Sequence, residues 1–102
     1  MKDISDLRIC RELLDFSNYI WKICIKWDFL AQKTVGIQLI RAVDSISANI
    51  AEGFGRFHYN ENLHFCYYAR GSLEETKDWL RKAFVPKLIP ESEKDNISEF
   101  LP

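Results

Sequence analysis

The sequence has little of what marks fibrous, disulfide-stapled or strongly charged proteins. Four glycines and three prolines exclude a collagen-like or low-complexity chain. Three cysteines form no CxxC pair, and an odd number argues against a complete disulfide framework, so we expect reduced thiols. The formal charge of -1 gives no whole-chain attraction to nucleic acid or to an acidic membrane surface. Any site for a polyanion must therefore be local.

Long apolar runs are also missing. The most apolar stretch, residues 19–27, is interrupted by Lys22 and Lys26 and is far shorter than a membrane-spanning helix. The first six residues contain Asp3 and Asp6 and lead into no apolar segment of the kind found in a secretory signal. We therefore expect a cytoplasmic protein that makes no contact with a membrane.

What the chain does have is apolar content arranged at helical spacing. Of its 102 residues 47% are hydrophobic and 14% aromatic, which suits one folded domain of 12.0 kDa and is too much for a disordered chain. Apolar residues recur at intervals of three and four, which predicts helices over residues 7–27, from between Asp28 and Thr34 to Gly53, and over residues 60–82. No useful stretch alternates as a strand would. The predicted class is all-α.

Capping residues and helix breakers give the expected ends. Caps are predicted for the first helix at Ser5 or Asp6 and for the third at Asn60. Glycines 53 and 55 predict a break, because each costs about 1 kcal/mol relative to alanine inside a helix. Prolines 86 and 90 end the third helix, and residues 92–100 predict a short fourth one. The expected fold is a single domain, residues 1–102, formed by an antiparallel up-down four-helix bundle with a short or incomplete fourth helix.

The first predicted helix carries two apolar stripes, more than one helix hairpin can cover. One stripe consists of Leu7, Cys10, Leu14, Trp21 and Cys24, and the other of Leu13, Phe16, Ile20, Ile23 and Trp27. In the second helix, Ile37 and Ile40 lie off the main stripe, on a face that a monomer would leave exposed. We therefore predict an obligate homo-oligomer, with Ile37 and Ile40 as candidate interface residues.

Residues 41–56, RAVDSISANIAEGFGR, resemble the signature of the four-helix-bundle proteins encoded in intervening sequences of bacterial large-subunit rRNA genes. A second segment, residues 69–75 (ARGSLEE), is similar to the family's GSLxE segment, and the resemblance spans roughly residues 7–83. It implies an antiparallel bundle assembled as a ring, expected to be a homopentamer, and no enzymatic activity. It also implies a relation to the accessory variability protein of diversity-generating retroelements, which binds nucleic acid and a reverse transcriptase.

The signature residues allow a structural and a functional interpretation. The structural candidates are Ser45, Asn49, Glu52, Gly53, Gly55, Gly71, Ser72 and Glu75. In the structural interpretation, the second-helix amide and carboxylate hydrogen-bond across to the third helix near Ser72 and Glu75, and the three glycines permit close backbone approach. In the functional interpretation, Arg41, Arg56 and Arg70 come together on adjacent helices and bind phosphates of RNA or DNA. The aromatic residues of segment 54–70 could then stack on unpaired bases, although aromatics at helical spacing more often form core or interface.

Catalytic and metal-binding patterns are incomplete. Glu61-x-x-His64 matches half of the carboxylate-bridged metal motif of helical bundles, which needs a second copy and two further glutamates. His64 and Cys66 are two residues apart on a helix, so they cannot form a nucleophile–base pair. We therefore expect a protein without enzymatic activity, cofactor or metal. The preferred function is an RNA- or DNA-binding accessory or scaffold, the alternative is a module that recruits a protein partner, and a metal-dependent enzyme is the third.

Overall fold

The computed structural model describes residues 8–56 and 58–101, and every regular element in them is helical. Helix α1 covers Arg8–Cys24, and helix α2, Phe29–Ala31, continues through a π-helical turn, Gln32–Gly36, into α3, Ile37–Phe54. Helix α4 covers Tyr59–Phe84, and a 3-10 turn, Glu91–Glu93, leads into α5, Lys94–Phe100. The all-α class and the short fourth helix are confirmed.

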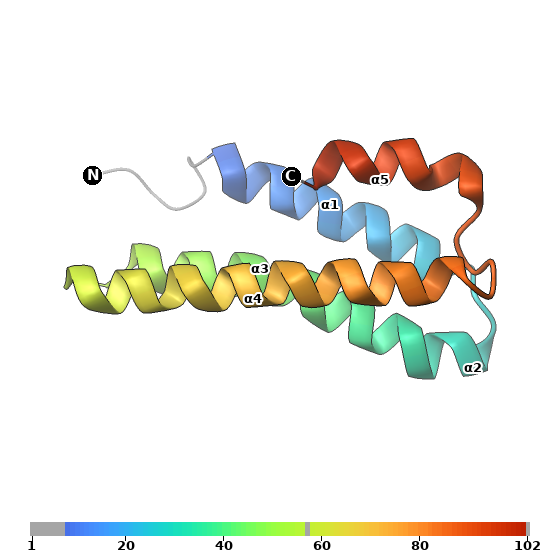
Figure 1. Ribbon diagram of the computed structural model, residues 1–102, viewed down its shortest axis with the longest axis horizontal. Helices are drawn as coiled ribbons and strands as arrows, with labels where there is room; N and C mark the ends of the chain where they lie inside the picture. The colour runs from blue at the N-terminus through green and yellow to red at the C-terminus, as the bar shows by residue number, and fades with distance from the viewer. Residues whose placement is uncertain (1–7, 57, 102) are drawn as a thin grey trace.

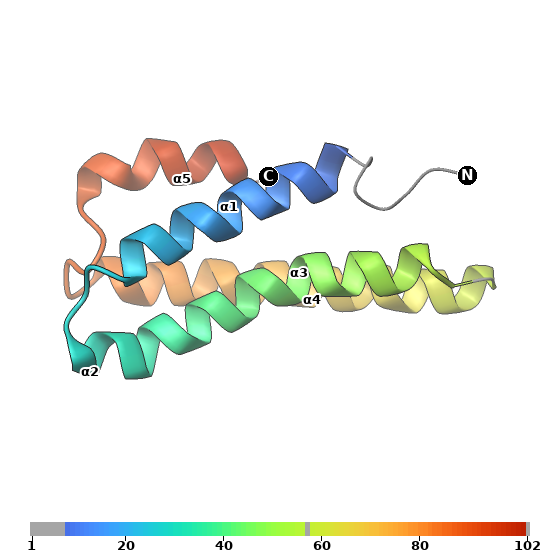
Figure 2. The same ribbon diagram turned by 180° about the vertical axis from the view of Figure 1, so that it is seen from behind.

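The molecule is elongated, 44 × 22 × 21 Å, and its long axis follows α3 and α4. These two helices run antiparallel side by side and make the most extensive contact between elements, while α1 lies along α3 and runs in the opposite direction (Figure 1). Helix α5 lies beside the C-terminal half of α1, as the view from behind also shows (Figure 2). The fourth position of the bundle is therefore occupied over part of its length.

Two of the predicted helix boundaries have a clear local cause. The Asp28 carboxylate accepts a hydrogen bond from the Ala31 backbone N–H at 2.8 Å, and this cap starts α2 within the predicted window. Gly55 is the C-cap of α3, where the break was expected. Helix α1 ends three residues before the predicted Trp27, and the chain then turns toward the Asp28 cap.

The predicted cap at Asn60 is wrong. Helix α4 already begins at Tyr59, and the residue before it, His58, has the extended backbone of an N-cap but no capping bond from its side chain. Asn60 lies inside the first turn, where its side chain cannot take the position of a cap. The caps predicted at Ser5 and Asp6 lie outside the described residues.

The core forms where the inner stripe of α1 meets α3, α4 and the C-terminal segment. Its largest fully buried side chains are Phe16, Ile20, Leu39, Ile89, Val43 and Thr76. The Phe16 ring stacks on Phe100 with centroids 4.9 Å apart, which fixes α5 against α1. The buried Thr76 hydroxyl donates to the Ser72 carbonyl oxygen at 2.8 Å, so its burial leaves no unpaired hydroxyl hydrogen.

Candidate interaction surfaces

The two predicted stripes of α1 have different environments. Most of the stripe that contains Phe16 and Ile20 faces the core, whereas Leu14 and Trp21 of the other stripe are 61% and 56% exposed. Ile25, just after α1, is 63% exposed. We call the surface formed by Leu14, Trp21, Ile25, Ile37 and Ile40 the outer face. Large apolar side chains that stay exposed together in this way are typical of contact surfaces.

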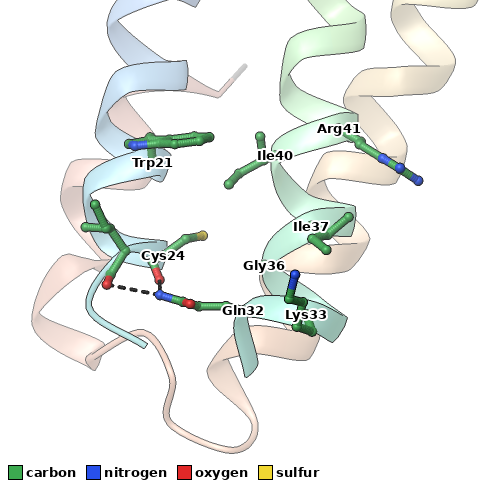
Figure 3. Close-up of a pocket in the computed structure, with 9 residues that line it drawn as sticks. Trp21, Cys24, Gln32, Lys33, Gly36, Ile37, Ile40 and Arg41 are labelled. Carbon is green, nitrogen blue, oxygen red and sulfur yellow. Dashed lines mark hydrogen bonds between the residues drawn. The ribbon is translucent and has the colours of Figure 1, made fainter. Parts of the chain in front are cut away.

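The outer face is hollowed where α1 meets α3. The hollow has a volume of about 420 Å³, and Trp21 and Ile40 point toward each other across it (Figure 3). At its end the Gln32 side-chain amide donates to the carbonyl oxygens of Cys24 and Ile25, at 3.2 and 3.1 Å, and so closes the last turn of α1. The backbone carbonyl groups at this end of the hollow therefore have a hydrogen-bond donor.

Ile37 and Ile40, the two candidate interface residues, are less exposed than the sequence predicted. Ile37 and Ile40 are half-buried, because they line this hollow, and Ile40 also packs against the core. They form one wall of the groove, and Trp21 forms the facing wall.

A second hollow continues the outer face toward the start of α1. It has a volume of about 400 Å³ and is lined by Cys10, Arg11, Leu14, Ser17, Asp44, Ser47, Ala48 and Ala51. The Ser17 hydroxyl donates to an Asp44 carboxylate oxygen at 2.6 Å and joins α1 to α3. The small alanine side chains leave space between α1 and α3, so the two hollows follow one another along the seam between these helices.

The three candidate arginines do not form one cluster. Arg41 lines the first hollow at its margin, points away from Trp21 and makes no ion pair within the described part of the chain. Arg56 lies fifteen residues further on, about 20 Å along an almost continuous helix. Arg70 lines a different cavity, between α1, α3 and α4. The expectation that adjacent helices bring the three guanidinium groups together is therefore wrong.

Arg56 is already engaged inside the chain. Its guanidinium lies 3.1 Å from a carboxylate oxygen of Glu52 and 3.9 Å from one of Glu61, and it covers the Phe65 ring at 4.9 Å. These exposed ion pairs are weak, but both carboxylates compete with an external phosphate for the guanidinium. By contrast Arg11, which the sequence did not single out, lines the second hollow and has no ion pair in residues 8–56 and 58–101. The sequence feature that could have indicated Arg11 is its position next to Cys10, on the stripe that also contains the exposed Leu14 and Trp21.

Among the polar signature residues of the described chain, one hydrogen bond joins α3 to α4. The Asn49 amide donates to the Ser72 hydroxyl at 3.4 Å and to the Ser45 carbonyl oxygen at 2.9 Å. The Glu52 carboxylate pairs instead with Arg56, just beyond the end of α3. Glu75 is exposed and has no ion pair in the described residues, so the expected carboxylate contact across the seam is absent.

The three signature glycines have different environments. A Cβ atom on Gly53 would lie 3.0 Å from the Phe65 Cβ, and the Asn62 amide donates to the Gly53 carbonyl oxygen at 2.7 Å. This is the close approach that glycine permits. Gly55 meets carbonyl groups of its own helix, and a Cβ on Gly71 would meet nothing within 4 Å. The expectation of close approach is wrong for these two positions within the single chain.

Aromatic and metal-binding candidates lie near the start of α4. Tyr67 and Tyr68 are more than half exposed, and the latter meets the Phe65 ring edge-on at 5.6 Å. Phe57 and the Tyr59 side chain lie outside what the structure describes. Glu61 and His64 are exposed, and no three His, Cys, Asp or Glu side chains gather into a possible metal site in the described residues.

Three of the shifted pKa values belong to groups in the core or between α1 and the C-terminal segment, and the fourth belongs to Asp78, whose pKa is lowered by Lys82 and Arg81 on the surface of α4. Burial raises the pKa of the Cys24 thiol to about 11. Burial, and then the hydrogen bond that its hydroxyl donates to Glu93, raise the pKa of Tyr19 to about 12. The same hydrogen bond holds the pKa of Glu93 below its usual value. These three groups join α5 to α1 or fill the core, and none of them lies in a cluster arranged for catalysis.

The fold defines the protein as a small helical bundle with apolar hollows along α1. None of the described helices is both long and apolar enough to span a membrane. The sequence model of the 23S rRNA-intervening sequence protein family matches residues 5–101, so the chain belongs to that family. Neither the curated proteins nor the solved structures contain a match.

Proposed function

We propose that this protein acts by binding, as a homo-oligomeric helical scaffold of the cytoplasm that contacts RNA or DNA. The observation that carries the proposal is the outer face, where Leu14, Trp21 and Ile25 are each more than half exposed beside the groove walls on α3. A surface helix normally turns such side chains toward a core. A neighbouring subunit would supply that core.

The groove geometry supports a helix as the covering element. The two hollows follow one another along the seam between α1 and α3, and small residues on α3, Ala48 and Ala51, leave room for side chains of a third helix. A ring forms when each subunit offers such a groove and a different surface fills it. The family resemblance makes five the expected number of subunits.

Nucleic-acid contact is assigned to the arginines at the edges of the outer face. Arg11 and Arg41 have no ion pair within the described residues, and an assembly would repeat them once per subunit. Arg56 contributes less, because Glu52 and Glu61 share its charge. Tyr67 and Tyr68 offer exposed rings on which unpaired bases can stack.

Solution mass tests the self-association half of the proposal. We expect the wild-type chain to sediment with a mass several times 12.0 kDa at micromolar concentration. Ile25→Asp should shift it to the monomer, because it places a carboxylate in the contact. Val85→Asp is the matched control, since Val85 is 84% exposed at the end of α4 and lines neither hollow of the outer face. Equal behaviour of the two variants would contradict the proposed interface.

Salt-dependent binding to a mixed-sequence RNA tests the second half. Replacing Arg11 and Arg41 together with glutamine should weaken binding and lower the slope of log affinity against log salt by about 0.7 for each lost phosphate contact with a single strand. Arg81→Gln is a control of the same chemistry, because Arg81 lies on α4 and pairs with Asp78 at 3.6 Å. Slopes that do not differ between the variants would remove these arginines from the proposal.

The second candidate is a scaffold that recruits a protein partner without touching nucleic acid. The contacts of Arg56 with Glu52 and Glu61 favour this function, since one of the three arginines predicted to bind phosphate already pairs with carboxylates of its own chain. An oligomer that is indifferent to RNA at low salt would select this function. Removal of the arginine charges would then change nothing in RNA titrations.

A further inference from the structure

The positive charge of the chain is gathered at one end of the molecule. Figures 1 and 2 show that the turn after α1, the short helix α2 and the end of α4 all lie at this end. Their residues, 22–33 and 77–90, contain seven basic and two acidic side chains, a net charge of +5, and we call them the basic end. The rest of the described chain contains six basic and eleven acidic side chains. The nearly neutral total therefore hides a separation of charge along the 44 Å axis.

The basic end also carries the four most exposed large apolar side chains among the described residues. Val85, Phe29 and Leu30 are 84%, 73% and 72% exposed, and Ile25 follows them. Ile25 borders the first hollow of the outer face, whereas the other three line none of the hollows described above. They therefore project from the end of the molecule into solvent.

Lysines stand beside these apolar side chains. The Lys33 Nζ atom lies 5.5 Å from the centroid of the Phe29 ring. Four lysines of the basic end make no ion pair within the described residues: Lys22, Lys26, Lys33 and Lys87. With Glu91 and Glu93 of the adjoining 3-10 turn included, the net charge is still +3. The exposed apolar side chains thus lie in a surface that attracts anionic groups.

We propose that the basic end docks the protein on the surface of an anionic phospholipid membrane. Phe29, Leu30 and Val85 enter the boundary between headgroups and acyl chains, while the lysine ammonium groups stay at the level of the anionic headgroups. Apolar insertion together with a basic patch is the pair of contributions that membrane binding of a peripheral protein requires. A fluid lipid surface needs no preformed hollow to accept projecting side chains.

The length of the molecule lets the basic end act independently of the whole-chain charge. The sequence-based expectation of no membrane contact rested on that total charge and on the lack of a long apolar run. Salt screens charges beyond a Debye length, about 8 Å at physiological ionic strength. Because the molecule is 44 Å long, acidic side chains at the far end lie outside this range when the basic end docks.

A second copy of this chain matches the basic end poorly, because its acidic and its exposed apolar side chains lie in different places. The acids of residues 91–101 have no exposed large apolar side chain among them. On α1 the exposed Leu14 has both Arg11 and Asp15 beside it, so that surface is neutral. An exposed tyrosine on α4 lies one turn before Arg70. A surface that is both apolar and acidic is therefore better supplied by lipid than by this chain.

A nucleic acid matches only half of the basic end. Its phosphates would engage the lysines but would leave the aliphatic side chains of Leu30 and Val85 in water. A lipid surface covers both the charges and the apolar side chains.

Co-sedimentation with vesicles tests the proposal. We expect the wild-type chain to bind phosphatidylcholine vesicles that contain about 30% phosphatidylserine at least roughly tenfold more tightly than vesicles of phosphatidylcholine alone. Added salt should weaken this binding. Equal binding to the two kinds of vesicle, or no binding at millimolar lipid, would overturn the proposal.

Matched substitutions at the two ends of the molecule sharpen the test. Phe29→Ser should weaken vesicle binding about tenfold, whereas Ile9→Ser, at the start of α1, should leave it unchanged. Replacing Lys26 and Lys33 with glutamine should weaken it about fivefold for each lysine lost, since each basic side chain near an anionic surface contributes by about that factor. Arg8→Gln is the charge control at the far end. Equal effects at the two ends would overturn the proposal.

Solution mass and RNA binding distinguish the other occupants. Phe29→Ser should leave both unchanged, so the proposal does not depend on self-association or on RNA contact. A monomeric wild type that binds the anionic vesicles would contradict self-association and support the membrane surface. A fall to the monomer in Phe29→Ser would make a second copy the occupant. Loss of RNA binding in the double lysine variant, without any vesicle binding, would make RNA the occupant. Either of these last two results would overturn the proposal.

Discussion

Helices α3 and α4 enclose their contact, whereas α1 leaves much of its apolar surface open. Along the α3–α4 seam, Asn62 donates to the Gly53 carbonyl oxygen, and Asn49 reaches Ser72. Helix α1 packs on α3 and meets α5 over part of its length, so the hollows of the outer face and the cavity lined by Arg70 all have α1 as a wall. The α3–α4 hairpin is closed by these hydrogen bonds, and α1 presents the apolar surface on which the proposed self-association depends.

The largest difference in stability between the buried and the open side of α1 should appear when Ile20 and Ile25 are each replaced by alanine. Ile20, on the inner side of α1, is fully buried, whereas Ile25, just beyond the helix, is 63% exposed. We expect Ile20→Ala to cost about 2–5 kcal/mol of unfolding free energy in urea titrations, because it leaves a cavity. Ile25→Ala should cost less than about 0.5 kcal/mol in dilute protein.

Protein concentration sharpens this comparison. If Ile25 is covered in an assembly, the stability lost in Ile25→Ala should grow with protein concentration, since association stabilises the wild-type chain by mass action. A large loss for Ile25→Ala at every concentration would mean that the outer side of α1 belongs to the core of a single chain.

A second test compares two glycines on the hairpin itself. Gly53→Ala should destabilise the protein by about 1–3 kcal/mol, because the new Cβ would lie 3.0 Å from the Phe65 Cβ. Gly71→Ala should stabilise the single chain by up to about 1 kcal/mol, since nothing lies within 4 Å and alanine is the better helix former. Thermal unfolding of both variants measures the difference, and equal losses would contradict the open environment of Gly71.

A smaller effect is expected where α5 is attached to α1. The lowered pKa of Glu93 stabilises the folded chain above the carboxyl's unfolded pKa, and this contribution is lost as the pH falls through the folded pKa. Tyr19→Phe removes the hydrogen bond that lowers the pKa. The variant should therefore be less stable than wild type at pH 7, and the difference should shrink as the pH falls through the folded pKa of Glu93. A difference that stays constant over an acid titration would show that Glu93 is not the partner that matters.

The raised pKa of Tyr19 predicts a loss of stability as the pH rises, whereas the lowered pKa of Glu93 predicts a loss as the pH falls. Its neutral form stabilises the folded chain below the unfolded pKa, and this contribution disappears as the pH rises toward about 12. Ultraviolet titration of the tyrosinate should find one tyrosine that ionises late in the wild type and is missing in Tyr19→Phe.

The smallest perturbation is chemical labelling of the cysteines. Cys66 is exposed on α4, whereas Cys24 is buried and its pKa is raised to about 11. At pH 8 a thiol reagent should modify Cys66 in the native protein and Cys24 only after unfolding. Mass spectrometry of the labelled chain measures the order, and early reaction of Cys24 would contradict its burial in the core.

Much of the fold could be predicted because helical spacing is a local property. The three long helices and the short fourth one follow from apolar residues three and four apart, and from Gly55 and Pro90 near their ends. The start of α4 was misplaced by one residue because Asn60 is a good cap wherever the backbone is extended, and the sequence does not give the backbone angle at His58.

The sites were harder to predict because they depend on how helices cross. Spacing found both stripes of α1 but could not say which one faces the core. The spacing placed Arg41 and Arg56 on one helix face, but most of the length of α3 separates them. The contact of Arg56 with Glu61 could not be predicted, because Glu61 belongs to the next helix, α4. Arg70 was grouped with them although it lines a different cavity, between α1, α3 and α4. Such relations between helices arise only when the chain is folded.

The central claim is that the outer face of α1 is completed by another copy of the chain. Sedimentation equilibrium of the wild-type protein at micromolar concentration tests it most directly. A mass several times 12.0 kDa, reduced to that of one chain by Ile25→Asp but not by Val85→Asp, is the predicted result. A wild-type mass of 12.0 kDa throughout the micromolar range would contradict the account.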